Sequence, residues 1–324
     1  MKIIGAGMAG LLAANMLRKY EPEIWEAQPS LPDNHGALLR FRSQLVAEAS
    51  GQRFREVRVS KGFRWASSVL AGPPPIPAVN LYSRKVTGRV LPRSVMSLEP
   101  STRYIAPDDF TATLARGLRM ELGKGVTLEM IQRWAGEGEA IVNTIPMPVL
   151  MKIVGWETSL RFEHQPIWSL RTRITHPITE VYQTIYYPGD EPWYRASITG
   201  DLIIIESLRE IGSQPADIPL DWITAVLRDF GINEVHHEFP TIHHQPFGKI
   251  APCEDSERKA FILAMTDQWG LYSLGRFGTW RQILLDDLVQ DIRIIDTMIS
   301  ERSIYNRHML FHSTTSPRKG GLVP

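Results

Sequence analysis

The chain has 324 residues, of which 43% are hydrophobic and 22% are charged, and its formal net charge is +1. These values are ordinary for a soluble globular protein, and the length accommodates one large or two medium domains. The only cysteine, Cys253, excludes an intramolecular disulfide and a multi-cysteine metal site, and it predicts a reducing, cytoplasmic setting. No apolar run reaches the ~20 residues of a membrane span, and the first residues are typical of a folded strand rather than of a signal peptide.

A short glycine-rich stretch follows the first expected strand, residues 2–4. Gly5, Gly7 and Gly10 match the pattern G-x-G-x-x-G, and an alanine- and leucine-rich helix is expected over residues 11–17. In this arrangement the first glycine makes the turn, the second lets a pyrophosphate approach the backbone, and the third lets helix and strand pack closely. The free amides at the helix start, which include those of Met8 and Ala9, favour an anion.

The spacing also predicts an acidic residue about twenty positions further on, at the end of a second strand, to bind ribose hydroxyls. Glu26 ends the stretch EIWE and meets this expectation. Ala27 and Gln28 follow it, so no adjacent base favours a 2′-phosphate. The sequence therefore predicts a bound dinucleotide, and this pattern alone does not decide which one.

The charge is unevenly distributed along the chain. Residues 1–95 contain 14 Lys and Arg against 6 Asp and Glu, a net charge of +8, so residues 96–324 carry −7. Two interpretations stay open, a solvated basic face that partly neutralises a diphosphate and a surface for a polyanion such as nucleic acid. Without a helix-turn-helix, zinc-finger or RNP motif, nucleic acid is expected as a substrate rather than as a sequence to be read.

The remaining elements of the first half are expected as follows. A helix covers residues 43–49 and ends at Gly51, and a strand covers residues 54–65. The proline-rich residues 71–80 are expected as a non-helical linker or lid. A helix is predicted over residues 107–122, and short strands over residues 126–130 and 140–145.

The second half begins with a β-rich stretch. Residues 168–176, 179–188 and 192–207 have strand character, and SITGD is predicted to be a hairpin turn. A helix is expected over residues 219–230, an apolar strand over residues 260–266 and a long closing helix over residues 280–299. Alternating β and α units at both ends thus flank an inserted β-rich section. The last residues, 320–324, resemble part of an expression-tag cleavage site.

Three stretches carry a family resemblance: the turn in LYSLGRFGTWRQ, the stretch AIVNTIPMPVL, and NHGALLRFRS. Together with the N-terminal glycines they resemble FAD proteins related to amine oxidases and UDP-galactopyranose mutases. The resemblance covers the first forty residues, residues 140–150 and residues 260–298. It departs from the family at Gly36, where a double glycine is usual.

This resemblance implies an α/β fold, with a Rossmann-like (GR2-type) FAD-binding domain and an inserted β-rich substrate domain. The FAD-binding domain is expected to comprise residues 1–60, 100–150 and 255–300, and the substrate domain residues 61–99 and 151–254. FAD is favoured over NAD as the cofactor. The cofactor-binding residues that it implies are Gly5, Gly7, Met8, Ala9, Gly10, Glu26, Gly36, Arg42, Thr144, Pro146, Gly275, Arg276, Phe277, Gly278 and Trp280.

A narrower resemblance is carried by LLRFRS, LYSRKVTGR and YIAPDDF, which are similar to stretches of phage-encoded flavoproteins. Some relatives of that type are implied in DNA hypermodification, where a flavoenzyme processes an amino-acid group attached to thymine. The implied activity is an FAD-dependent oxidation or cleavage at a C–N bond, within the host cytoplasm. The basic N-terminal portion fits a DNA substrate.

Candidate catalytic residues come from the glycine turn and from the basic segment. Arg276 is the first choice for a polar role, with a salt bridge to the final helix as the alternative. Lys61, Tyr82 and Lys85 are further candidates, for which a surface role is the alternative. Trp280 either shields the flavin ring or packs in the core.

The inserted β-section supplies two candidates for substrate contact, Tyr194 and Arg195, which a cross-strand pair also explains. The histidines of HHEFPTIHH do not predict a metal site, because adjacent side chains on a strand point to opposite faces. Two other function classes stay open. One is a non-oxidative flavoenzyme that resembles UDP-galactopyranose mutase, and the other is a non-enzymatic binding protein on a flavoprotein fold.

Overall fold

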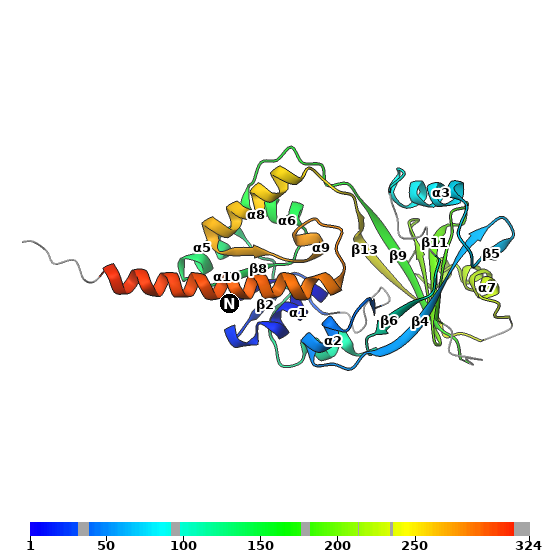
Figure 1. The fold of residues 1–324 in the computed structure, drawn as a ribbon, viewed down its shortest axis with the longest axis horizontal. Coiled ribbons are helices and arrows are strands. Elements are labelled where there is room, and N and C mark those ends of the chain that lie inside the picture. The colour runs from blue at the N-terminus through cyan, green and yellow to red at the C-terminus, as the bar shows by residue number, and fades with distance from the viewer. Residues whose placement is uncertain (32–38, 92–97, 176–181, 213, 234–235, 314–324) are drawn as a thin grey trace, which may run out of the picture.

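The structure, a computed structural model, describes residues 1–31, 39–91, 98–175, 182–212, 214–233 and 236–313. Its ribbon has two lobes, one with a parallel sheet between helices and one dominated by a large mixed sheet (Figure 1). Within the described residues, no helix combines the length and the apolar character needed to cross a membrane.

The first lobe is built on a five-stranded sheet whose strand pairs are all parallel. Its order is β14 (Leu271–Ser273), β8 (Ile141–Asn143), β1 (Lys2–Ile4), β2 (Glu23–Glu26) and β7 (Arg119–Leu122). The central strands are short and apolar because helices cover both faces of the sheet. Ile3, Ile24 and Val142, for example, are fully buried.

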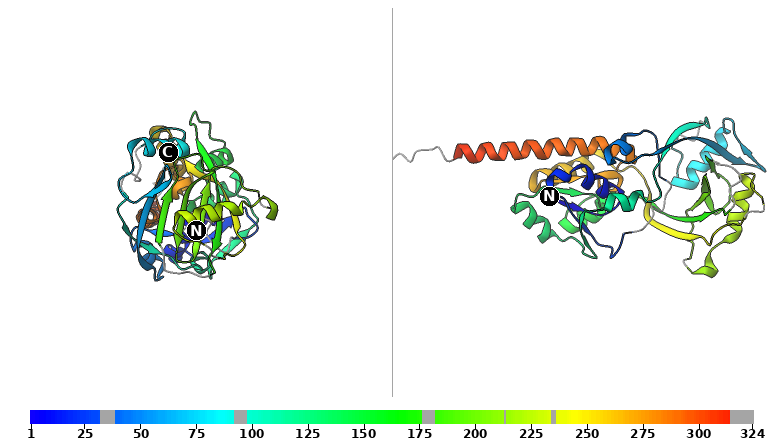
Figure 2. Two further views of the ribbon diagram at one scale, coloured as in Figure 1. Left: turned by 90° about the vertical axis from the view of Figure 1, so that its right-hand side faces the viewer. Right: turned by 90° about the horizontal axis from the view of Figure 1, so that it is seen from below.

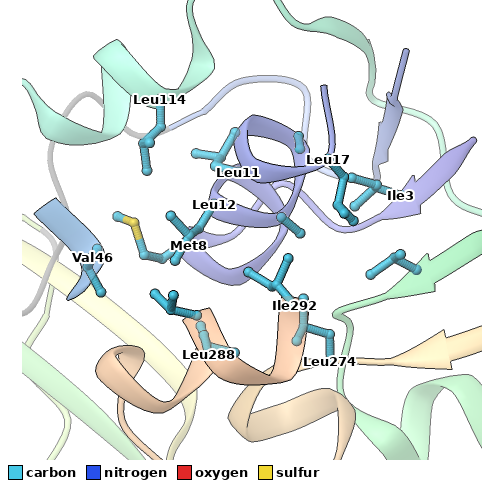
Figure 3. Packing of buried hydrophobic residues seen from close by; sticks show 14 of the residues in the cluster. Ile3, Met8, Leu11, Leu12, Leu17, Val46, Leu114, Leu274, Leu288 and Ile292 are labelled. Carbon is cyan, nitrogen blue, oxygen red and sulfur yellow. The ribbon is translucent and has the colours of Figure 1, made fainter. Parts of the chain in front are cut away.

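Helices on the two faces of this sheet bury separate hydrophobic clusters. One face packs against α1 (Met8–Met16), α2 (Leu45–Ser50), α4 (Phe110–Ala115) and α10 (Leu285–Ser313). Figure 3 shows Met8 and Leu12 of α1 turned toward Leu288 and Ile292 of α10. The other face packs against α5 (Leu128–Gly136), α6 (Met147–Val154) and α8 (Asp255–Trp269). The 3₁₀ turn Arg18–Tyr20 follows α1, and the short α9 (Gly275–Gly278) precedes α10.

The second lobe is a nine-stranded mixed sheet. Its order is β13 (Thr241–Ile250), β9 (His164–Arg173), β12 (Leu202–Ser207), β11 (Trp193–Thr199), β10 (Tyr182–Tyr186), β4 (Arg55–Trp65), β6 (Ser101–Ile105) and β3 (Arg40–Phe41), and β5 (Ser68–Leu70) pairs with β4. After a 3₁₀ turn at Pro215–Asp217, α7 (Leu220–Asp229) packs on one face of this sheet, which is rich in isoleucine. α3 (Ile76–Thr87) covers part of the opposite face.

The two lobes share chain segments rather than being joined by a single linker. Short β3 and the strands β4 and β6 belong to the large sheet, although the chain around them also forms α2 and α4 of the first lobe. α10 begins near the junction of the lobes and runs away from the β-rich lobe (Figures 1 and 2). The division of the chain into a cofactor domain and a substrate domain at the expected boundaries stays a proposal.

Several predicted elements are confirmed. The helix expected over residues 43–49 is α2, which ends at the left-handed Gly51, and the strand expected over residues 54–65 is β4. SITGD forms the turn between the antiparallel strands β11 and β12. The helix expected over residues 219–230 is α7. The α/β fold class, a Rossmann-like parallel sheet with an added β-rich part, is confirmed as well.

The strands predicted at residues 260–266 and 126–130 are wrong, because both stretches lie in or at helices. The Glu254 side chain caps α8 by accepting from the amides of Ser256 and Glu257, and Gly270 ends this helix in the left-handed conformation. The Thr127 hydroxyl caps α5 by accepting from the Met130 amide at 3.4 Å. Short apolar runs do not distinguish strand from helix, and the capping residues decide in favour of helix here.

Two predicted helix boundaries and the expected non-helical linker over residues 71–80 are also wrong. The helix expected over residues 107–122 ends at Ala115, since Gly117 has a φ of +74° and the chain then enters β7. α3 begins inside the proline-rich residues 71–80, because Pro75 and Pro77 lie at its first turn, where proline is tolerated. The closing helix starts at Leu285 rather than at Trp280, whose φ of +48° interrupts the helix.

Candidate functional site

The candidate site lies at the carboxyl edge of the parallel sheet, where the strand order reverses between β1 and β8. In open α/β sheets, ligands bind outside the carboxyl ends of the strands at such a switch point. Three loops that follow strands meet there: the glycine loop after β1, the segment 144–146 after β8, and α9 after β14. They come from the beginning, the middle and the end of the chain.

The glycine loop has the geometry that the spacing predicts. Gly5 has a φ of +96°, which disfavours other residues, and an added Cβ at Gly10 would lie 2.0 Å from the Gly5 carbonyl oxygen. At Gly7, in contrast, no described atom lies within 4 Å of an added Cβ. Gly5 and Gly10 are therefore required by the packing of the chain itself, whereas Gly7 faces open space.

The N-terminus of α1 is available to an anion. Its first residue after the loop is Met8, whose side chain is buried in the core. No described side chain caps the helix at Gly7, and its first turn contains no acidic residue. The amides of a first helical turn have no intrahelical partner, and the helix dipole adds a partial positive charge.

Glu26 lies directly across from the glycine loop. Its Oε2 accepts a hydrogen bond from the Ala6 amide at 2.8 Å, and its Oε1 accepts one from the Gln28 amide at 2.9 Å. A carboxylate offers about four acceptor positions, so two remain for hydroxyl donors. Glu26 is thus placed at the end of β2 as the spacing predicts.

The segment after β8 holds the glycine loop in place. The Thr144 hydroxyl donates to the Ile4 carbonyl at 2.9 Å and lies 3.2 Å from the Gly5 carbonyl. Pro146 follows as the N-cap residue of α6. Thr144 therefore holds the backbone of the glycine loop through these hydrogen bonds. Pro146 precedes the first residue of α6, the helix that follows.

α9 packs directly on both of these segments. Gly275 has a φ of +85°, and an added Cβ there would lie 3.0 Å from the Ala9 Cβ. An added Cβ at Gly278 would lie 2.9 Å from the Asn143 carbonyl oxygen. Close packing of this kind requires glycine, and it brings the two ends of the chain together as the sequence predicts.

The side chains around α9 have different environments. The Arg276 guanidinium lies 5.9 Å from the centroid of the Phe277 ring, and its Nε is buried without a hydrogen-bond partner among the described residues. Burial lowers the pKa of Arg276, and the neighbouring Arg195 charge lowers it further. Trp280 is 2% exposed, and its Nε1 donates to the Ala251 carbonyl at 3.0 Å. The structure thus places Trp280 in the core beside Phe162.

Of two further residues predicted to bind the cofactor, Arg42 contacts the start of α10, and Gly36 is not among the residues that the structure describes. The Arg42 guanidinium forms an ion pair with Asp287 at 3.2 Å and is about half exposed, and its backbone amide donates to Asp286. These contacts tie the start of α2 to the start of α10. Gly36 lies outside the described residues.

A buried polar network on the large sheet contains both predicted substrate residues. The Tyr194 hydroxyl donates to Glu206 at 2.9 Å, and the Arg195 guanidinium forms an ion pair with the same carboxylate. Burial by itself raises the pKa of Glu206, but the charge and hydrogen bonds of Arg195 outweigh it, so the pKa is lowered. The Lys249 ammonium lies 4.7 Å from the centroid of the Tyr194 ring.

This network belongs to what we call the polar face, the side of the large sheet opposite α7. Strand register places its members in facing pairs. The polar face comprises Lys61, Thr184, Arg195, Ser197 and Glu206. The ring of Phe277 in α9 lies 6.4 Å from that of Phe247 on β13, and Lys249 of the same strand reaches the Tyr194 ring, so α9 lies beside this part of the sheet.

Not all of the predicted catalytic residues lie where the polar face meets α9. Tyr82 is 2% exposed in an aromatic cluster, with ring centroids 5.9 Å from Phe63 and 5.4 Å from Tyr186. Lys85 donates to the carbonyls of Gly189 and Trp193, both at 2.8 Å. Burial lowers the pKa of Lys85 to about 8. Lys61 lies on the polar face, and burial lowers its pKa as well.

Arg40 also reaches the polar face, and no motif in the sequence marks it. Its Nη2 donates to the hydroxyls of Thr184 at 2.5 Å and Ser197 at 3.1 Å, while its Nη1 is buried without a hydrogen-bond partner among the described residues. Burial lowers the pKa of Arg40 to about 10, and the charge of Arg195 contributes. Its partners lie 144 and 157 residues away, so no local pattern identifies it.

The histidines of HHEFPTIHH lie on β13, an edge strand of the large sheet, and in the segment that precedes this strand. His244 stacks on Trp168 with ring centroids 4.6 Å apart, and His237 bonds to the Glu238 carbonyl. Across the described part of the chain, no group of three or more His, Cys, Asp or Glu residues is arranged to hold a metal ion.

No protein-family model matches the chain, and no curated protein sequence matches it. Solved structures share its fold. An oxidoreductase from Methanosarcina mazei aligns with a TM-score of 0.53 and 11% identity, covering 92% of this chain and all of that chain. A geranylgeranyl bacteriochlorophyll reductase-like protein from Thermoplasma acidophilum aligns with a TM-score of 0.52 and 12% identity, covering 94% of this chain and 78% of that chain. At such identities the likeness establishes the fold.

Proposed function

We propose that this protein is an FAD-dependent oxidoreductase or lyase that acts at a C–N bond of an amine or amino-acid group. The observation that carries the proposal is the meeting of the glycine loop, the segment 144–146 and α9 at the switch point of the parallel sheet. A dinucleotide that extends from Glu26 past the N-terminus of α1 to α9 would lie against all three of these segments. Its fold, shared with an oxidoreductase, agrees with this proposal.

The residues present fit FAD. Gly7 leaves the backbone open to a diphosphate, and Glu26 keeps acceptor positions for ribose hydroxyls. Toward α9, two further buried polar atoms have no hydrogen-bond partner among the described residues, Oδ1 of Asn143 and Oγ of Ser273. Buried polar groups are nearly always paired, so such atoms at one edge of a sheet favour a polar ligand there.

FAD, when bound, supplies a two-electron acceptor for a hydride from the carbon beside the substrate nitrogen. With loss of a proton from that nitrogen, the substrate becomes an imine, and water then cleaves the C–N bond. Within this scheme, Arg276 orients the substrate at α9, and the Tyr194–Arg195–Glu206 network forms the opposite wall. Because Tyr194 and Glu206 of that network are buried, this wall also limits the access of water to the substrate nitrogen.

Modified thymine in phage DNA is the substrate that we favour. The resemblance to phage-encoded flavoproteins suggests it, and the net charge of +8 in residues 1–95 supports it through attraction to phosphates. Arg55, Arg58 and Arg103 lie on β4 and β6, where they extend this basic character along the sheet.

The proposal predicts that an amine-bearing substrate reduces the bound flavin. The protein, carrying FAD, is mixed anaerobically with thymidine that bears an amino acid on its 5-methyl group, and the flavin absorption is followed. We expect bleaching of the yellow band, with unmodified thymidine as the control that leaves it unchanged. A flavin that stays oxidised with every amine and amino acid tested would contradict C–N chemistry, and perturbation by a UDP-sugar instead would favour a mutase-like function.

A further inference from the structure

A groove of about 400 Å³ lies beside the edge strand β14, between the end of α8 and the last part of α10. Large apolar side chains border it and are exposed, with Leu263 at 61%, Ile294 at 50% and Met298 at 39%. Leu263 lies one helical turn before Asp267, and Ile294 lies one turn before Met298. Exposed apolar side chains that gather around a hollow mark an interaction surface. The residues that line the groove are Thr266, Asp267, Tyr272, Met298, Glu301 and Arg302.

α10 extends beyond this groove. Among the α10 side chains that the structure describes, Ile299 is the last that is buried. The helix continues to Ser313, and its end projects past the other elements of the first lobe (Figures 1 and 2). A helical segment shorter than ~12–15 residues is marginal in water, because most of the stability of a protein helix comes from the packing of one face. The projecting end therefore needs a surface on which to pack.

The groove holds charges of opposite sign. Glu301 and Arg302 are both exposed, and neither forms an ion pair with a described residue. They follow each other in α10, and neighbouring residues of a helix do not face each other. Asp267 is also exposed, and residues 303–313, the projecting end, contain one arginine and no acid. A surface that presents an acid beside a base complements a second copy of itself turned around by a two-fold axis, so the charges favour another copy of this chain as the partner.

We propose that two copies of this chain form a dimer in which their α10 helices pack antiparallel across the groove, about a two-fold axis between Glu301 and Arg302. Glu301 of each copy then faces Arg302 of the other, so both charges gain a partner. The contact is isologous, because both copies use the same surface, and it therefore closes at two subunits. The dimer contact is independent of the proposed function, since neither α9 nor the glycine loop lines the groove.

The sequence of α10 matches this register on both sides of the axis. Residues at equal distances from the axis lie level in an antiparallel pair. Met298 therefore lies level with Tyr305 of the second copy, and Ile294 lies level with Met309 of the second copy. Along the chain these four residues recur at spacings of four, seven and four, which is the repeat of one helix face. The projecting end of each copy thereby covers the exposed apolar side chains of the other.

Analytical ultracentrifugation of the full chain with its cofactor, over a range of concentrations, measures the Kd of the dimer. Glu301→Arg places like charges opposite each other on both sides of the axis, and we expect Kd to rise about ten-fold or more. Adding Arg302→Glu to the same chain restores both pairs in the opposite sense and should return Kd close to the parent value. Glu210→Arg, the same change at an exposed residue of the second lobe, is the matched control and should leave Kd unchanged.

Met298→Lys tests the apolar part of the contact. The substitution replaces an apolar side chain that the dimer covers twice, once in each copy, and we expect Kd to rise about a hundred-fold or more. Leu81→Lys, at an apolar residue of α3 that is 46% exposed, is the control and should have no effect. Because both positions are exposed in the single chain, the unfolding temperature and FAD content of the monomers should match those of the parent protein.

A parent protein that stays monomeric at every concentration would overturn the proposal, as would a dimer that Met298→Lys leaves intact. If Met298→Lys does not fold, the charge exchange decides, because both of its positions are exposed. A dimer that Glu301→Arg weakens and the double variant does not restore would refute the antiparallel register. Assemblies larger than a dimer would contradict the two-fold symmetry. None of these results bears on the proposed function, which is judged by bleaching of the flavin.

Discussion

We expect Gly10→Ala to weaken flavin binding by a factor of about a hundred or more in Kd. The added Cβ would lie 2.0 Å from the carbonyl oxygen of Gly5, a backbone atom that cannot rotate away. α1 must then move off β1, which removes its N-terminus from the position that we propose for the diphosphate. Because α1 is central to a core cluster, the free energy of unfolding also falls. Fluorescence titration with FAD and urea unfolding measure the two effects.

Gly7→Ala is the matched control that isolates the ligand. Gly7 has an ordinary φ of −67°, and no described atom lies within 4 Å of an added Cβ. The free energy of unfolding without cofactor should therefore change by less than about 0.5 kcal/mol. FAD should nonetheless bind about ten-fold more weakly, because the methyl group occupies the space through which the pyrophosphate approaches the backbone. Unchanged FAD affinity in Gly7→Ala would place the diphosphate elsewhere.

Glu206→Gln destabilises the fold strongly. The substitution keeps the shape of the side chain but leaves Arg195 without its counter-charge, and breaking a buried ion pair in this way costs about 3–5 kcal/mol. About a third of the Arg195 side chain is exposed, so solvent screens part of the charge and we expect the lower end of that range. Urea unfolding at neutral pH measures the loss. Glu121→Gln breaks the exposed pair with Lys124 and should cost less than about 1 kcal/mol.

The effect of Glu206 depends on pH in a defined direction. Its pKa is lowered in the folded protein, so the unfolded chain binds more protons and the stabilisation is fully present above the ordinary glutamate pKa of about 4.3. It is lost as the pH falls through the lowered value. The difference in unfolding free energy between the parent protein and Glu206→Gln should therefore shrink below that pH. A difference that stays constant from neutral to acidic pH would show that Glu206 is not ionised in the fold.

Local patterns predicted the parts of this protein in which a few adjacent residues decide the conformation. Gly5 and Gly10 determine the conformation of the glycine loop, and Glu26 follows at the expected distance. Gly51 ends α2 for the same kind of reason, a left-handed conformation at a single residue. The fold class followed because these units alternate at both ends of the chain.

Other features depend on contacts that no local pattern contains. Residues 260–266 are apolar enough for a buried strand, and the caps at Glu254 and Gly270 make them a helix. Arg40 donates hydrogen bonds to Thr184 and Ser197, and only the folded sheet brings these residues close to it. Arg195 lies opposite Glu206 in the hairpin of β11 and β12. The strand register shifts between Trp193 and Arg195, and the sequence does not predict this irregularity.

The central claim is that both ends of the chain enclose one FAD molecule at the carboxyl edge of the parallel sheet. The most direct measurement is the absorption spectrum and mass spectrum of the cofactor released when the purified protein is denatured. We predict FAD at about one molecule per chain, or its full recovery after reconstitution. Release of a nicotinamide dinucleotide, or a protein that neither carries nor takes up FAD, would contradict the claim.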